Sequence, residues 1–118
     1  MTQEEKDFLL KDLCARIPYG VKVQVFNYGV ETVETLYQID LDGYISTIES
    51  DELKYSYKPY LFPLSSMTGE QKTSHNFLKK SAYANPIKLI KFYHKNHLDY
   101  QGLIEKDLAI DATNLNIY

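Results

Sequence analysis

The feature that most constrains this fold is a pair of alternating segments that ends at an Asp-Gly dipeptide. In residues 21–26 a valine occupies every second position, with Lys22 and Gln24 between, which is the period of a strand with one buried face. A turn at 27–29 follows, and the second alternating segment runs to Asp42-Gly43. This dipeptide favours a two-residue type I′ hairpin, because both central residues need positive φ. The sequence therefore predicts an antiparallel meander over residues 21–48.

The predicted hairpin also sets a register and two faces. It pairs Leu41 with Tyr44, Ile39 with Ser46, and Tyr37 with Ile48. On this prediction Val33, Thr35, Tyr37, Ile39 and Leu41 share one face, opposite Glu34, Gln38 and Asp40. Asp40 and Asp42-Gly43 resemble a fragment of a calcium loop, but the turn explains the same residues and the other EF-hand ligands are missing.

A first helix is predicted before the meander. Thr2 and Glu5 have the spacing of a capping box. An apolar stripe of Leu10, Leu13, Cys14 and Ile17 then runs to Pro18-Gly20, which ends the helix. The stripe predicts that Cys14 is a small buried side chain rather than a nucleophile.

Two further helices are predicted in the second half of the chain. Thr68, with Gln71 in the capping-box position, begins one that runs to about residue 83, with Phe77, Leu78 and Ala82 inward. Asn85-Pro86 begins the next, which carries Ile87, Leu89, Ile90, Phe92 and Tyr93 and ends near Asn96.

Length and composition restrict the class of protein. The 118 residues are 44% hydrophobic and contain a single cysteine, which fits one domain with its own core and excludes an internal disulfide or a thiolate zinc cage. The first residues lack a signal pattern and no apolar run approaches a membrane span of about 20 residues, so we expect a cytoplasmic protein without membrane contact. The predicted fold is a single α+β domain over residues 1–118: an N-terminal helix, a three- to four-stranded, mainly antiparallel meander and two C-terminal helices.

Charge and aromatic content bear on the partner. Thirteen Lys and Arg residues against sixteen Asp and Glu give a net charge of −3, which offers no electrostatic reason to expect DNA. The chain has 11 Tyr and 5 Phe residues but no Trp. Tyrosine is enriched at interfaces but also packs well on sheets.

The segment 54–62, KYSYKPYLF, is the first candidate binding surface. Pro59, together with the following Pro63, predicts an edge strand or a strap over the surface. Interleaved lysines and aromatics can stack bases and meet phosphates in single-stranded nucleic acid, and they can equally contact a protein. The candidate residues here are Lys54, Tyr57, Lys58 and Tyr60.

The segment 94–102 is the second candidate. His94 and His97 are three residues apart and Asp99 follows, so a metal or acid–base site is one interpretation. The favoured interpretation is helix-end chemistry, with Asn96 at the last turn and Gly102 in a left-handed conformation. His97, Asp99 and Tyr100 are then included as interaction-surface residues, while Leu103, Ile104 and Leu108 fold back onto the core. Ser65 and Ser66 lack the glycines of a nucleophile elbow, and capping explains Thr68.

Three segments carry a resemblance: LCARIPYGVKV at 13–23, KPYLFPLSSMT at 58–68 and HLDYQGLIEKDLAIDAT at 97–113. Together they are similar to a family of small proteins without an assigned activity, encoded in gut-bacterial genomes and their phages or prophages. The loop around 49–55 and the stretch from His75 to Leu89 look least like that family. The resemblance implies a mobile-element setting, in which small proteins often modulate host or phage machinery, and it supplies no catalytic residue.

Together these features predict a non-enzymatic interaction protein with a protein partner and no cofactor. Nucleic-acid binding through residues 54–62 is the first alternative. A small metal-dependent or acid–base enzyme that uses His94, His97 and Asp99 is the second. Homo-oligomerisation is left open by the sequence.

Overall fold

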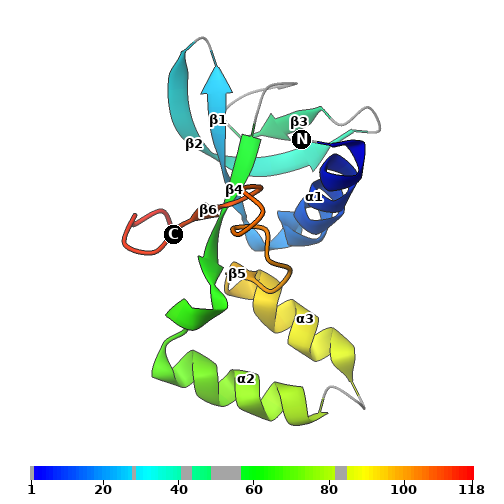
Figure 1. Ribbon diagram of the computed structural model, residues 1–118, viewed down its shortest axis with the longest axis vertical. Helices are drawn as coiled ribbons and strands as arrows, with labels where there is room; N and C mark the ends of the chain where they lie inside the picture. Colours follow the sequence, from blue (N-terminus) through cyan, green and yellow to red (C-terminus); the bar gives the residue numbers. More distant parts are fainter. Residues whose placement is uncertain (1, 28, 41–43, 49–56, 82–84) are drawn as a thin grey trace.

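The computed structural model describes residues 2–27, 29–40, 44–48, 57–81 and 85–118 (Figure 1). Its helices are α1 (Gln3–Arg16), α2 (Gly69–Ser81) and α3 (Pro86–Lys95), and short 3-10 turns occupy Ile17–Tyr19 and Leu64–Ser66. Its strands are β1 (Lys22–Asn27), β2 (Val30–Ile39), β3 (Ile45–Thr47), β4 (Tyr57–Pro63), β5 (Leu98–Asp99) and β6 (Ile110–Asp111). The α+β class, with a helix before the sheet and two helices later, is confirmed.

The sheet is mixed rather than mainly antiparallel. Its order is β3-β2-β1-β4-β5, and β6 also pairs with β4. The first four strands form antiparallel pairs, whereas β5 and β6 run parallel to β4. The prediction missed β5 and β6 because two residues are too few to show a periodic pattern.

The prediction that prolines keep residues 57–63 at an edge is wrong. β4 lies inside the sheet, with Val23 opposite the buried Pro59. The strand tolerates proline because it exchanges partners along its length: residues 57–59 pair with β1, and residues 60–63 pair with β6 and β5. Pro63 is its last residue, where a missing N–H is least disruptive.

The predicted faces of β2 are also wrong. Glu34 and Leu36 point inward, while Val33 and Tyr37 are exposed. A bulge between Leu36 and Gln38 then reverses the alternation, and Ile39 packs against the core.

The register between β2 and β3 differs accordingly. Ile39 lies opposite Ile45 and Gln38 opposite Ser46, so the predicted pairing of Ile39 with Ser46 is wrong. The predicted turn at Leu41, Asp42 and Gly43 lies outside the described residues.

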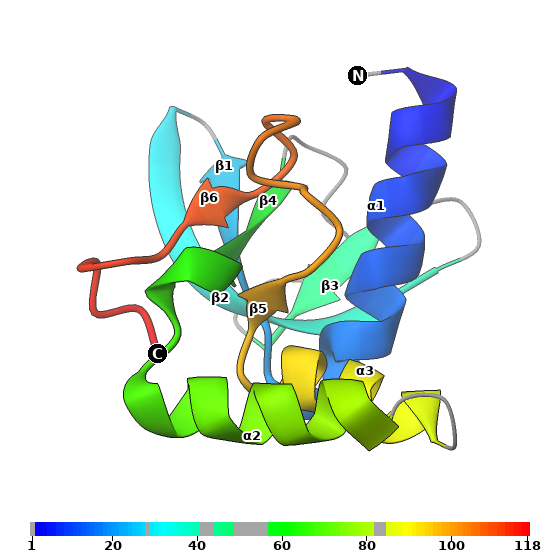
Figure 2. The ribbon, with the colours of Figure 1, turned by 60° about the horizontal axis from the view of Figure 1, so that its bottom comes forward.

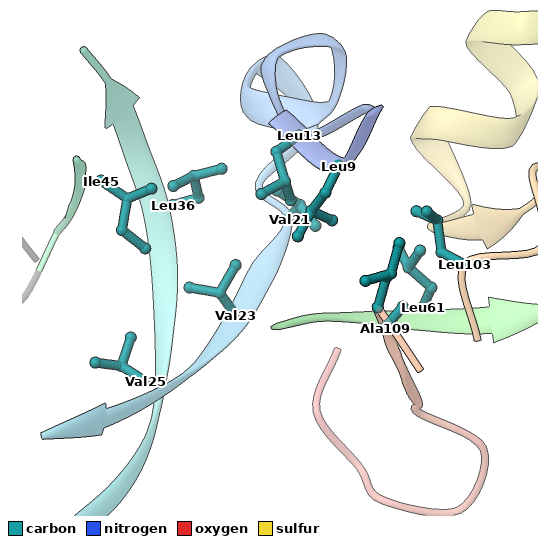
Figure 3. Close-up of a cluster of buried hydrophobic side chains, with 11 residues drawn as sticks. Leu9, Leu13, Val21, Val23, Val25, Leu36, Ile45, Leu61, Leu103 and Ala109 are labelled. Carbon is teal, nitrogen blue, oxygen red and sulfur yellow. The ribbon is translucent and has the colours of Figure 1, made fainter. Parts of the chain in front are cut away.

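The hydrophobic core lies between α1, the sheet and the segment after α3 (Figure 3). Leu9 and Leu13 of α1 lie beside Val21, and the valines of β1 continue the cluster toward Ile45. On the other side, Leu61 of β4 meets Leu103 and Ala109. The C-terminal segment therefore completes the core, as its apolar residues predicted.

Helix α1 begins at the predicted capping box: Thr2 Oγ1 accepts from the Glu5 amide, and Glu5 accepts from the Thr2 amide. Its buried face, however, consists of Leu9, Asp12, Leu13 and Arg16. Cys14 is exposed, so its predicted burial is wrong. The apolar stripe did not predict the buried face correctly, because the helix buries the Asp12–Arg16 ion pair on that face.

Helices α2 and α3 form a hairpin at one end of the molecule, with α3 between α2 and the remaining elements (Figure 1). We call residues 69–95 the α2–α3 hairpin and the rest of the chain the body. The Thr68–Gln71 capping box and the end of α3 at Asn96 are confirmed. Phe77 is exposed, so its predicted inward position is wrong. The predicted inward Ala82 lies outside the described residues.

Candidate functional site

The segment 54–62, predicted as a binding surface, does not form an exposed surface where it is described. Lys54 lies outside the described residues, and for Tyr57 only the backbone is described. Lys58 Nζ lies 2.9 Å from Asp107 Oδ1 in an ion pair. Tyr60 is only 6% exposed, and burial raises the pKa of its hydroxyl. Tyr60 is thus a core residue, and its assignment to an interaction surface is wrong.

The histidine segment forms three separate structural contacts. His94 Nε2 lies 3.0 Å from the Tyr100 hydroxyl. His97 stacks on Tyr118, with ring centroids 3.7 Å apart. Both oxygens of Asp99 accept backbone N–H groups, from Leu103 and Ile104.

These contacts fit the predicted helix-end chemistry. Asn96 caps α3, while His97 and Gly102 adopt φ of 55° and 75°. In the part of the chain that is described, no group of three His, Cys, Asp or Glu side chains is arranged to hold a metal ion. His97, Asp99 and Tyr100 therefore position the returning C-terminal segment.

The protonation of this segment follows from its burial. Burial, with Arg16 and Lys22 nearby, lowers the pKa of His97 to about 4. Burial also lowers the pKa of His94, where the Arg16 cation adds to the effect. Burial raises the pKa of the Tyr118 hydroxyl to about 12. The histidines are thus neutral near pH 7, which suits their stacking and hydrogen-bonding roles.

Another exposed surface with large apolar side chains lies on the α2–α3 hairpin, whose helix α2 runs along the lower end of the molecule in Figure 2. Among the described residues, α2 contains none that is buried. Phe77 is 71% exposed and Ile87 61% exposed, and Ile90 is exposed as well. Contiguous exposed apolar surface is typical of binding sites, and Phe77 lines one hollow together with Leu78 and Phe92.

The two helices are held together by polar contacts at their interface. His75 Nε2 lies 2.8 Å from the Tyr93 hydroxyl. Gln71 Nε2 donates to Asn96 Oδ1 at 3.2 Å. The rings of His75 and Phe92 stack, with centroids 6.1 Å apart. The hairpin therefore has a defined geometry although one of its helices lacks a buried face.

A groove runs along one side of this hairpin. Its apolar part, about 490 Å³, is lined by Thr73, Ser74, Phe77, Leu78 and Phe92. A polar hollow of about 430 Å³ is lined by Thr68, Glu70, Gln71, Ser74, Phe92, Lys95 and Asn96. The two hollows share Ser74 and Phe92, so they adjoin, and we call them together the α2–α3 groove.

The hairpin also differs from the body in charge. Residues 69–95 contain six lysines and one glutamate, a net charge of +5, while the rest of the chain has 7 Lys and Arg against 15 Asp and Glu, a net charge of −8. All six lysines (Lys72, Lys79, Lys80, Lys88, Lys91 and Lys95) are exposed. In the described ranges none of them forms an ion pair. The overall charge of −3 hid this division, which a sliding charge sum along the sequence would have found.

No protein-family model, no curated protein and no solved structure matches the chain. In the described ranges, every helix is too short or too polar to cross a membrane.

Proposed function

We propose that this is a non-enzymatic interaction protein that binds a protein partner through the α2–α3 hairpin. The observation that carries the proposal is the exposure of Phe77, which lines a groove together with Leu78 and Phe92. Burial of an exposed aromatic side chain against a partner contributes favourably to the free energy of binding.

The hairpin is suited to this role because its outer surface does not pack against the body. The core cluster contains no residue of α2 or α3. The hairpin is attached to the body through α3, where Tyr93 and His94 are buried. The face that carries Phe77 can therefore specialise for binding without loss of the core.

The resemblance to phage and prophage proteins adds a setting to this proposal. A small protein encoded on a mobile element acts most simply by occupying a surface of a larger host or phage protein. We extend the proposal to such a modulator, whose partner belongs to the machinery of the host or the phage.

Nucleic acid is the second candidate partner, and the six exposed lysines of the hairpin favour it. Neutralised phosphates release counterions, so this binding would weaken steeply as salt increases. A partner held by apolar contacts would respond much less.

The test is a tagged pull-down from native host lysate, with and without nuclease, followed by mass spectrometry. The bait is compared with Phe77→Ser and with a matched control, Phe26→Ser. Phe26 is also exposed, at 48%, but lies on β1 of the body.

We expect a stoichiometric protein that survives nuclease, is retained by Phe26→Ser and is lost with Phe77→Ser. Recovery that disappears with nuclease would replace a protein partner with nucleic acid. A partner that Phe77→Ser retains would show that the hairpin is the wrong surface.

A further inference from the structure

We infer that the partner contributes an amphipathic helix with an acidic flank, which lies in the α2–α3 groove as a third helix. This inference rests on the proposed function and specifies the chemistry of its partner. Three observations carry it: the shape of the groove, the position of its apolar residues, and a row of lysines along α3 that reaches the groove at Lys95.

The shape of the groove suits a helix. It lies between two packed helices, and its lining extends from Thr68, the residue before α2, to Leu78 of α2. At 1.5 Å per residue this is roughly 15 Å, or almost three helical turns. Side chains of a third helix can insert into such a groove as ridges do between packed helices.

The apolar lining requires a partner with an apolar stripe. Phe77 and Leu78 of α2 face the same hollow as Phe92 of α3. An amphipathic helix meets such a surface with anchors at i, i+3 or i+4, and i+7. A nucleic-acid duplex, by contrast, presents phosphates and sugars at its surface and would leave Phe77 in water.

The charge of the rims is asymmetric. Lys88, Lys91 and Lys95 follow one another at spacings of three and four residues, so they form one row along α3. Lys95 lines the groove itself. The rim from α2 contributes Glu70, Thr73 and Ser74 instead. A helix in the groove would therefore place Asp or Glu toward α3 and keep them away from α2, where Glu70 lies.

The experiment is the selection of a display library of helical peptides on the full chain. The enriched peptides are then measured by fluorescence anisotropy against the unchanged chain and two charge-reversal variants. The test variant is Lys88→Glu, Lys91→Glu, Lys95→Glu. The matched control is Lys72→Glu, Lys79→Glu, Lys80→Glu, which changes the charge equally but alters no residue that lines the groove.

We expect enriched peptides with an apolar stripe and acidic residues on one flank. Reversal of the α3 row should weaken them by about 100-fold, because like charges would then meet at the rim. The control should change their Kd by less than about threefold, because a surface ion pair away from the contact contributes little. Phe77→Ser should weaken binding by about tenfold or more.

Two results would overturn the inference alone: enriched peptides without an acidic flank, or equal effects of the two charge reversals, while Phe77→Ser still abolishes binding. Peptides that ignore Phe77→Ser would overturn the proposed site as well. The same anisotropy measurement is made with single-stranded DNA and with phosphatidylserine vesicles. If the binding of either depends on the α3 lysines more strongly than the binding of any selected peptide, the lysine row serves a different class of ligand.

Discussion

The body and the α2–α3 hairpin differ in how far they bury similar side chains. In the body, Tyr60 is buried and even the Asp12–Arg16 ion pair is fully enclosed. In the hairpin, Phe77 and Ile87 are mostly exposed, and in the described part of α2 no residue is buried. The body also exposes apolar side chains, among them Tyr37 and Ile48, but it encloses a hydrophobic core to which neither α2 nor α3 contributes a residue.

The difference extends to electrostatics. Arg16 donates to both oxygens of Asp12 and to the Leu98 carbonyl, so a charge in the body joins α1 to β5. The hairpin lysines are solvated instead and form no ion pair in the described ranges. The buried Asp12–Arg16 pair is thus structural, whereas the hairpin lysines are accessible to a ligand.

The largest expected effect is that of Asp12→Ala on the body. The variant leaves the buried Arg16 guanidinium without its counter-charge, which costs about 3–5 kcal/mol in the free energy of unfolding. Urea denaturation measures this loss. The double variant Asp12→Leu, Arg16→Met should recover part of it, because no unpaired charge remains. A loss below about 1 kcal/mol for Asp12→Ala would show that the ion pair is not structurally important.

A matched pair of aromatic substitutions tests the comparison directly. Tyr60→Ala should destabilise the protein by about 3 kcal/mol, because it opens a cavity beside the sheet. Phe77→Ala should change the free energy of unfolding by less than about 0.5 kcal/mol, because the side chain is already exposed. Thermal and urea unfolding of both variants provide the measurement. Equal losses would abolish the distinction between a self-sufficient body and an exposed hairpin.

The smallest effect is confined to acid pH. The pKa of about 4 for folded His97 is below the ordinary value of 6.5, so between these values the unfolded chain binds a proton that the folded chain does not. Stability should therefore fall as the pH decreases from about 6.5 to 4. His97→Asn should reduce this slope, and asparagine tolerates the positive φ at this position.

Urea denaturation at pH 7.5, 5.5 and 4.5 measures the slope for both chains. Some slope should remain in the variant, because burial also lowers the pKa of His75 and His94. Identical slopes would contradict the burial of His97.

The sequence predicted those parts of the fold that local chemistry determines. Capping boxes at Thr2 and Thr68 and the stop after Asn96 depend on neighbouring residues, and the structure confirms them. The faces of β2 were not predictable in this way, because the bulge after Leu36 appears only when β3 pairs with it.

The candidate site was predicted less well, again for physical reasons. Tyr60 and Phe77 are both aromatic residues in amphipathic segments, and only the packing of β4 against β1, β5 and β6 separates a core position from an exposed one. The net charge of −3 is the sum of a positively charged hairpin and a negatively charged body, so it concealed both. The basic region coincides with α2 and α3, whose bounds the total charge does not reflect.

The exchange of partners along β4 has a consequence for the order of folding. The first half of β4 pairs with β1, which lies about 35 residues earlier in the chain. Its second half pairs with β5 and β6, which follow about 35 and 50 residues later. The β1–β2 hairpin can form from adjacent residues, but the parallel half requires the chain to traverse both α2 and α3 first. We therefore expect closure of the sheet, rather than formation of any helix, to limit the rate at which this protein reaches its native state.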